Sequence, residues 1–310
     1  MNILLTLLLL FEMSSILAKE IGFIGLGIMG KGMASNLINK LSGLETLVVW
    51  NRGSEACEAL STQFPGKVRI VPTAADVIKS CTTTICMLST EEASTAVFDQ
   101  PGGVFDAITE GKVIVDCATL SAERMIYENQ IISSKGGRFI EAPVSGSKVP
   151  AENGQLIFLC GGDEDIFNEI SPALDCMGKA KFLFGPVGQG SRVKLLVNMV
   201  MGSMMGSFAE GMKLGETLDL PLDKILQVFD LGAMANPMFK MKGPNFINDK
   251  FDPHFPLKHQ QKDMRLALEL AKQNNLDLPI SSKANDAYVS VLQQSGDEDF
   301  SAVYKAVNKK

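Results

Sequence analysis

Short β-rich runs alternate with helical stretches over more than half of the sequence, from Ile21 to about Gly185. The runs are EIGFIG, TLVVW, KVRIV, TTICML, KVIVDCAT, RFIEAPV, QLIFLCGG and KFLFG. Strands that alternate with helices predict a parallel sheet with crossover helices. Several runs are apolar throughout, which is typical of strands that helices cover on both faces. We therefore expect an α/β domain in the first part of the chain.

Helical periodicity without a convincing strand follows Gly185. The predicted helices cover residues 188–218, 222–231, 256–273 and 280–294, with a short last one near 300–307. At 310 residues the chain exceeds the usual size of one hydrophobic core. We predict an α/β domain at residues 19–185 and an all-α domain at residues 186–310, joined by the long helix.

Residues 1–18 allow two interpretations. The apolar run from Ile3 to Phe11 is too short to span a bilayer, but it has the length of a signal-peptide core. Alternatively, Met13 is the true start. Six cysteines without a CxxC pair favour a reducing compartment. We expect a cytoplasmic protein, with organellar or secretory entry as the alternative if residues 1–18 are a cleaved targeting segment.

The composition excludes two classes of partner. A net charge of −6 provides no basic surface for nucleic acid. With two histidines and no metal-like cysteine spacing, we expect no metal site.

Three glycines directly follow the first run and open a helix: Gly25, Gly27 and Gly30. This spacing permits a tight turn, close approach of the backbone to a pyrophosphate, and close packing of helix on strand. The N-terminus of the helix adds free N–H groups and the positive end of its dipole. A structural turn is the alternative. We predict a Rossmann-type dinucleotide site at Gly25, Leu26, Gly27, Ile28, Met29 and Gly30.

The second run ends in Asn51 and Arg52, without an acidic residue. An NAD enzyme usually has an acid there to bind the ribose 2′-hydroxyl, whereas an arginine can pair with a 2′-phosphate. An arginine solvated in a loop is the alternative. These two residues predict NADP(H) rather than NAD(H).

Lys194 and Asn198 lie one turn apart in a long apolar stretch, on a stripe that also contains Gly190, Gly202 and Gly206. A helix that is apolar all round is expected to be buried, and burying an ammonium is costly. A lysine that extends its ammonium into water is one interpretation. The other is a general acid, because partial burial lowers the pKa of a lysine toward neutrality. Asn198 would then hold the ammonium or the substrate oxygen.

Ser145, Gly146 and Ser147 follow a strand-like run that ends in Pro143. Open α/β sheets bind ligands at the carboxyl ends of their strands. These three residues are therefore candidates for substrate binding, although an ordinary turn has the same composition.

Four motifs in order resemble the β-hydroxyacid dehydrogenase family, from about Lys19 onward. They are the cofactor motif FIGLGIMGKGMASN, the substrate motif EAPVSGS, the catalytic motif GQGSRVKLLVN, and KHQQKDMRLAL, which contains Lys262 and Asp263. Ala118 in DCAT departs from the serine that the family usually has. Within the family, the sequence is most similar to the NADPH-dependent glyoxylate/succinic semialdehyde reductase branch.

The resemblance implies that Lys194 is the catalytic residue and that the dinucleotide lies along residues 22–36. It implies cofactor contacts from Thr119 and Lys262, and a substrate carboxylate bound by Ser145 to Ser147 near Asn198. Without the resemblance, Lys262 and Asp263 would be interpreted as solvated residues.

The activity that the resemblance implies is reduction of glyoxylate to glycolate and of succinic semialdehyde to 4-hydroxybutyrate, by a homo-oligomer without a membrane span. The helical domain would serve the substrate and dimerisation. Oxidation of 3-hydroxyisobutyrate or another 3-hydroxy acid is an alternative. A non-catalytic module that binds a dinucleotide and forms oligomers is another.

Overall fold

The computed structural model describes residues 19–307. The chain divides into two compact units, and the boundary falls between Lys194 and Leu195. We call the part up to Lys194 unit 1 and the part from Leu195 unit 2. The proposed targeting segment at residues 1–18 lies outside the described residues. No helix in the described part of the chain is long and apolar enough to cross a membrane.

Unit 1 contains one sheet with the strand order β3-β2-β1-β4-β5-β6-β8-β7, and β9 lies beside β8. Its strands are β1 (Glu20–Ile24), β2 (Thr46–Trp50), β3 (Val68–Ile70), β4 (Thr83–Cys86), β5 (Val113–Asp116), β6 (Arg138–Glu141), β7 (Val144–Ser145), β8 (Leu156–Gly162) and β9 (Gly178–Leu183). The first six strands pair in parallel, as the sequence predicts.

The parallel prediction is wrong for β6 and β7 where they pair with β8, whereas β9 pairs with β8 in parallel. Both β6 and β7 pair with β8 in the antiparallel direction. The connection from β6 to β8 contains only β7 and the short helix α8 (Lys148–Asn153). The helix in this connection has six residues, which is short for a parallel crossover, so the chain turns back instead.

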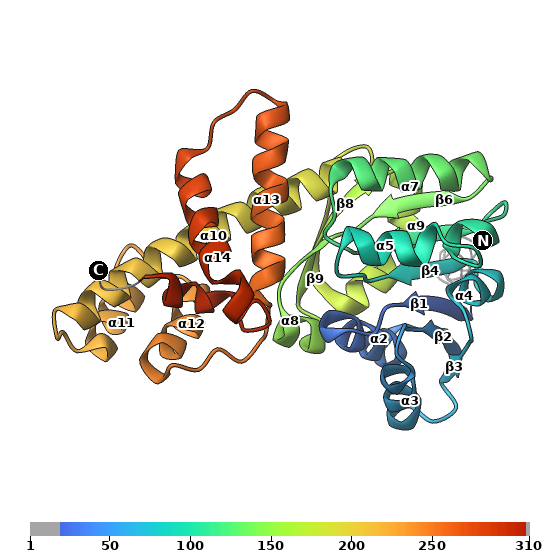
Figure 1. The fold of residues 1–310 in the computed structure, drawn as a ribbon. Coiled ribbons are helices and arrows are strands. Elements are labelled where there is room, and N and C mark those ends of the chain that lie inside the picture. The colour runs from blue at the N-terminus through green and yellow to red at the C-terminus, as the bar shows by residue number, and fades with distance from the viewer. Residues whose placement is uncertain (1–18, 308–310) are drawn as a thin grey trace, which may run out of the picture. The chain divides into compact units, whose positions relative to one another are not determined.

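Helices cover both faces of the sheet (Figure 1). They are α2 (Ile28–Lys40), α3 (Ser54–Gln63), α4 (Ala74–Ser80), α5 (Glu91–Phe98), α6 (Val104–Ala107), α7 (Ala122–Ser134) and α9 (Glu164–Met177). One hydrophobic core joins α2, α3 and α9 to the sheet, and the other joins α4, α5, α6 and α7. Neighbours in a strand alternate between them: Val113 and Val115 face the first core, and Ile114 faces the second.

Unit 2 contains helices and no strand among its described residues. The long helix α10 (Gln189–Thr217) runs across the boundary between the units. The other helices are α11 (Leu222–Leu231), α12 (Pro237–Asn248), α13 (Leu257–Gln273), α14 (Pro279–Ser295) and the 3₁₀ helix η1 (Phe300–Ala306). Their core includes Met205, Phe208, Met264 and Tyr288. A buried ion pair of 2.7 Å between Lys242 and Asp299 connects α12 to η1.

Candidate active site

Loops with candidate chemistry follow the carboxyl ends of neighbouring parallel strands in unit 1. Gly25 follows β1, Asn51 follows β2, Thr119 follows β5 and Ser145 lies beyond β6. The strand order reverses direction along the chain between β1 and β4. Ligands of open α/β sheets bind at such a switch point, outside the carboxyl ends of the strands. The fold of unit 1 therefore gathers four of the predicted segments at one edge of the sheet.

The glycine loop after β1 has the geometry that a pyrophosphate requires. Gly25 has φ +97°, and a Cβ on it would lie 2.3 Å from the carbonyl oxygen of Met87. A Cβ on Gly30 would lie 1.9 Å from the oxygen of Gly25, whereas a Cβ on Gly27 would meet open space. No acidic residue occupies the first turn of α2, and no side chain caps its N-terminus. The loop therefore fits a dinucleotide, with Gly27 at the open approach.

Asn51 braces this glycine loop from β2. Its Oδ1 accepts the N–H of Leu26 at 2.9 Å, and its Nδ2 donates to the carbonyl oxygen of Gly53 at 2.9 Å. The N–H of Leu26 is therefore used within the protein, and the Leu26 side chain is buried in the core. Arg52 is exposed next to this brace, where its guanidinium can meet a phosphate.

Ala118 stands where the family usually has serine. Its methyl group is fully buried in the core that also contains Ile24 and Cys86, and its N–H donates to Asp116 Oδ1 at 2.8 Å. A serine hydroxyl in this place would be enclosed by the core. Thr119, the next residue, is partly exposed and directly follows the end of this buried segment.

The substrate motif leads from β7 into α8. Ser145 and Ser147 are partly exposed, and Gly146 between them has φ +135°, a backbone conformation that favours glycine. The helix that follows is held by Asn36 of α2, whose Nδ2 donates to the carbonyl oxygens of Ala151 at 2.8 Å and Glu152 at 3.1 Å. Asn36, the last residue of the stretch predicted to bind the cofactor, therefore contacts α8, the helix that follows the substrate motif.

Lys194 and Asn198 are both buried on α10, with 5% and 2% of their surfaces exposed. The glycines of their stripe serve packing. A Cβ on Gly190 would lie 2.2 Å from the oxygen of Leu159, and a Cβ on Gly202 would lie 2.4 Å from Gln260 Nε2. The expectation that the helix is buried all round is wrong: Leu196, Val200 and Leu214 are exposed.

Asn198 donates from Nδ2 to Asp263 Oδ2 at 2.6 Å, and Gln260 Nε2 donates to the backbone oxygen of Asn198 at 2.8 Å. Asp263 is almost fully buried and forms an ion pair of 3.1 Å with Lys262. Interpreting Asp263 as a solvated residue is therefore wrong.

Asp263 and Gln260 are partners of Asn198 that are not predicted from the sequence. Their spacing in the sequence could have indicated this role. On α13 the buried face contains Gln260, Asp263, Met264 and Ala267, so these two polar residues share a face with apolar ones.

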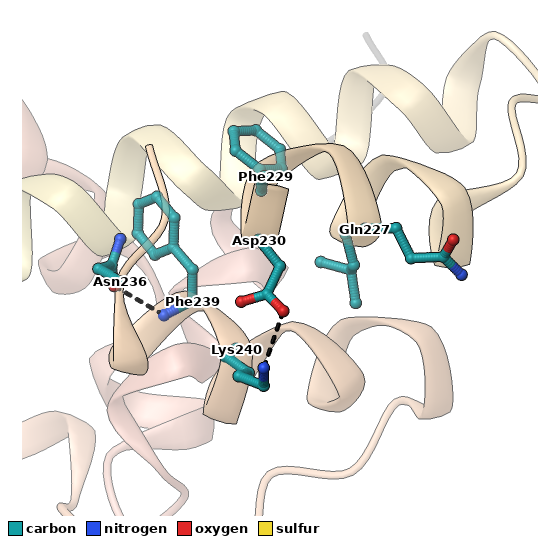
Figure 2. A pocket seen from close by; sticks show the side chains of 7 residues that line it. Gln227, Phe229, Asp230, Asn236, Phe239 and Lys240 are labelled. Carbon is teal, nitrogen blue, oxygen red and sulfur yellow. Dashed lines mark hydrogen bonds and ion pairs between the residues drawn. The ribbon is translucent and has the colours of Figure 1, made fainter. Parts of the chain in front are cut away.

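A separate pocket of about 140 Å³ lies between α11 and α12 in unit 2. Figure 2 shows Phe229 and Phe239 beside the ion pair between Asp230 and Lys240, which measures 2.8 Å. None of the residues that the sequence predicts for the site lines this pocket.

The sequence matches two protein families. Residues 20–188 match the NAD binding domain of 6-phosphogluconate dehydrogenase, and residues 188–307 match the NAD-binding domain of NADP-dependent 3-hydroxyisobutyrate dehydrogenase.

Two curated proteins and one solved structure are similar to this chain over more than nine-tenths of its length. Glyoxylate/succinic semialdehyde reductase 1 of Arabidopsis thaliana is 48% identical, over 93% of this chain and 98% of that protein. The chloroplastic reductase 2 of the same plant is 44% identical, over 93% of this chain and 79% of that protein. The structure of Mycobacterium tuberculosis 3-hydroxyisobutyrate dehydrogenase with L-serine has a TM-score of 0.81 and 26% identity, over 94% of this chain and 99% of that chain.

Proposed function

Since this chain belongs to the β-hydroxyacid dehydrogenase family of NAD(P)-dependent oxidoreductases, we propose that it reduces small aldehyde acids with NADPH. Glyoxylate and succinic semialdehyde, the compounds in the names of the two plant relatives, are the proposed substrates. The observation that carries this proposal is the burial of Lys194 and Asn198, one turn apart on α10. Burial of an ammonium is costly, so a lysine kept in such a place is expected to have a function.

NADPH supplies the hydride that reduces the aldehyde carbon. Lys194 donates the proton that the aldehyde oxygen needs as it becomes an alkoxide. Asn198 orients this end of the site, because its amide is fixed by Asp263. Ser145, Gly146 and Ser147 bind the carboxylate of the substrate with hydroxyl and N–H donors.

The proposed cofactor contacts extend around the edge of the sheet. Residues 25–30 hold the pyrophosphate, Asn51 braces their loop, and Arg52 pairs with the 2′-phosphate. Thr119 and Lys262 are further proposed contacts. In this proposal, residues 19–185 are the NADP-binding domain, and residues 186–310 are the helical domain that serves the substrate and forms the oligomer.

The reaction is tested by NADPH oxidation with glyoxylate and with succinic semialdehyde, in the wild type and in Lys194→Ala. We expect Lys194→Ala to lose at least about 100-fold in kcat and to bind NADPH as before, because a general acid contributes on that scale. Lys224→Ala, on exposed α11, is the matched control and should keep full activity.

The same assay separates the alternatives. Equal activity of wild type and Lys194→Ala would show that the role given to Lys194 is wrong. If the protein oxidises 3-hydroxyisobutyrate with NADP⁺ and reduces neither aldehyde, it is a hydroxy acid dehydrogenase. Tight NADPH binding without turnover of any of these acids would identify a non-catalytic module.

The cofactor preference is tested at Arg52. We expect Arg52→Ala to lower kcat/KM for NADPH by about 10-fold or more and to leave kcat/KM for NADH within about twofold, because the lost ion pair involves only the 2′-phosphate. Arg69→Ala, which removes an exposed pair with Glu20, should change neither value. A wild type that prefers NADH would contradict the proposal.

We propose a homo-oligomer formed through unit 2. Support comes from large apolar side chains that a single chain leaves exposed there, among them Leu231 with 88% of its surface exposed, Ile280 and Val228. A monomer would leave these apolar side chains exposed to water, which costs free energy. Light scattering should find a dimer or tetramer at micromolar concentration, and a monomer for the double variant Val228→Glu, Leu231→Glu.

We also propose a cytoplasmic location. The six cysteines are free and buried, which fits a reducing compartment. Cell fractionation with N-terminal sequencing tests this proposal. Mature protein that begins near Lys19 inside an organelle would contradict it.

A further inference from the structure

The carboxylate of Glu141 contacts the first turn of the helix that carries Lys194. Glu141 is the last residue of β6 and is fully buried. Its Oε1 accepts the N–H of Gly188 at 2.5 Å and of Gly190 at 2.9 Å. Its Oε2 accepts the N–H of Ser191 at 3.1 Å and the hydroxyl of Ser191 at 2.5 Å. Each carboxylate oxygen thus receives two hydrogen bonds from the start of α10.

These contacts match the ionised form of Glu141. Three of the four donors are backbone N–H groups, which cannot accept a proton from a carboxylic acid. A negative charge is also favoured at a helix N-terminus, where the dipole has its positive end. Burial raises the pKa of the Glu141 carboxyl, and the hydrogen bonds from Ser191, Gly188 and Gly190 oppose that rise.

Two glycines bring β8 into direct contact with the same turn. A Cβ on Gly190 would lie 2.2 Å from the oxygen of Leu159, and a Cβ on Gly161 would lie 2.4 Å from Glu141 Oε1. No side chain therefore separates the helix from the strand. The backbone of the strand supports the first turn, and the four hydrogen bonds to Glu141 fix how that turn is rotated.

Lys194 is carried by this turn. It follows Gly190 by four residues, which is one turn of an α-helix, and α10 is continuous between them. A rotation or shift of the first turn therefore moves Lys194 with it. A misplacement of about 1 Å at a reacting group can lower turnover on the order of 100-fold.

We propose that Glu141 is a positioning residue for Lys194: its buried carboxylate sets the rotation of the first turn of α10 and so the place from which the lysine delivers its proton. This inference rests on the proposed function, in which Lys194 is the general acid. Glu141 itself contacts neither substrate nor cofactor in this proposal. It belongs to the EAPVSGS stretch, which the sequence analysis interprets for substrate binding alone.

The first test is the kinetics of Glu141→Gln and Glu141→Asp. Glutamine has nearly the same shape, but its NH₂ group faces N–H donors instead of accepting from them. We expect Glu141→Gln to lower kcat by about 10- to 100-fold, with KM for NADPH within about twofold of wild type. Aspartate keeps two acceptor oxygens on a shorter side chain, so Glu141→Asp should recover part of the lost kcat.

A matched control separates positioning from general loss of stability. Ile170→Val removes one methyl group from the buried face of α9 in the same unit and should cost about 1 kcal/mol of unfolding free energy. We expect its kcat to equal that of wild type at a temperature where all variants are folded. A kcat of Glu141→Gln within twofold of wild type, a parallel loss of NADPH affinity, or Glu141→Asp no better than Glu141→Gln would overturn the inference.

Hydrogen exchange tests the contact without any turnover. In Glu141→Gln, the amides of residues 188–194 should exchange at least about 10-fold faster than in wild type, while those of β5 keep their protection. Unchanged protection at residues 188–194 would overturn the inference. If wild type reduces no aldehyde acid, the proposed function fails, and this measurement still decides whether Glu141 holds the turn.

Discussion

At the scale of single residues, two carboxyl groups in unit 1 meet where the protein excludes water. Asp116 at the end of β5 and Glu128 on α7 are both fully buried. Within the described residues, Asp116 Oδ2 and Glu128 Oε2 receive no hydrogen bond from a protein N–H or hydroxyl. Burial and then the charge of Glu128 raise the pKa of Asp116 well above its usual range, and burial raises the pKa of Glu128. We infer that the two carboxyls share one proton, which would satisfy both oxygens.

This pair predicts how stability depends on pH. The folded state keeps a proton that the unfolded chain releases, so the stabilisation is full below about pH 4 and is lost as the pH rises through the raised pKa values. We expect Glu128→Gln to lessen this loss, because its amide can donate to Asp116 while its oxygen still accepts from Ser94 and Arg124.

Urea unfolding at pH 5 and at pH 8.5 measures the effect. Relative to wild type, Glu128→Gln should gain about 1 kcal/mol between the two pH values, the equivalent of one pKa unit. Identical changes in wild type and variant would show that the two acids do not share a proton.

At the scale of elements, Asn36 joins the cofactor helix α2 to α8, the helix that follows the substrate motif. Its Nδ2 donates to three carbonyl oxygens, those of Gly32, Ala151 and Glu152. A Cβ on Gly32 would lie 2.7 Å from the backbone of Ala151, so the two helices touch without a side chain between them.

We predict that Asn36→Ala lowers the free energy of unfolding by about 1–3 kcal/mol, because the amide's buried carbonyl partners lose their donor. Asn39→Ala, on the exposed side of the same helix, should stay within about 0.5 kcal/mol of wild type. Equal unfolding midpoints in urea for the two variants would contradict this account.

The elements that the sequence predicts well are those with a continuous pattern. The two ends of α11 agree with the sequence prediction, and those of α10, α13 and α14 differ from it by one residue at most. The sequence gives no prediction for α12, because Pro237, Gly243 and Pro244 disfavour a helix. The structure resolves this conflict locally: Asn236 caps the helix by accepting the N–H of Phe239 at 2.9 Å, and Pro237 occupies its first turn, where no N–H is needed.

The site residues also divide into those that a local sequence pattern predicts and those that it does not. Gly25 to Gly30 are predictable because a spacing of three glycines depends only on neighbours in sequence. The contacts of Asp263 with Asn198 and of Glu141 with Ser191 join residues 50 or more positions apart. A single sequence has no local signal for such pairs, because they arise only when the strands and helices pack.

At the scale of the whole molecule, the cysteines are distributed unevenly. All six lie between residues 57 and 176, in unit 1, and all are buried. Burial raises the pKa of Cys81 and of Cys160 to about 12. Since the thiolate is the reactive form, we predict that native protein reacts slowly with a thiol reagent such as DTNB at pH 8, and that six thiols react at once in 6 M guanidinium.

NADPH should slow this labelling further. A ligand at 100 times its Kd stabilises the folded state by about 2.7 kcal/mol, so labelling that requires unfolding should slow about 100-fold. Labelling followed at 412 nm with and without NADPH measures this. One thiol that reacts rapidly in native protein would show a local opening of unit 1 that NADPH does not control.

The boundary between the units lies inside α10, so a cut between them would fall within a helix. A gene cut at codon 194 would divide one helix between two products and expose both cut ends. Recombination between related genes would preserve the helix when it joins them after Thr217 or before Gln189, where Gly185 and Gly188 adopt positive φ. A chimera made there would inherit α10, with both Lys194 and Asn198, from a single parent.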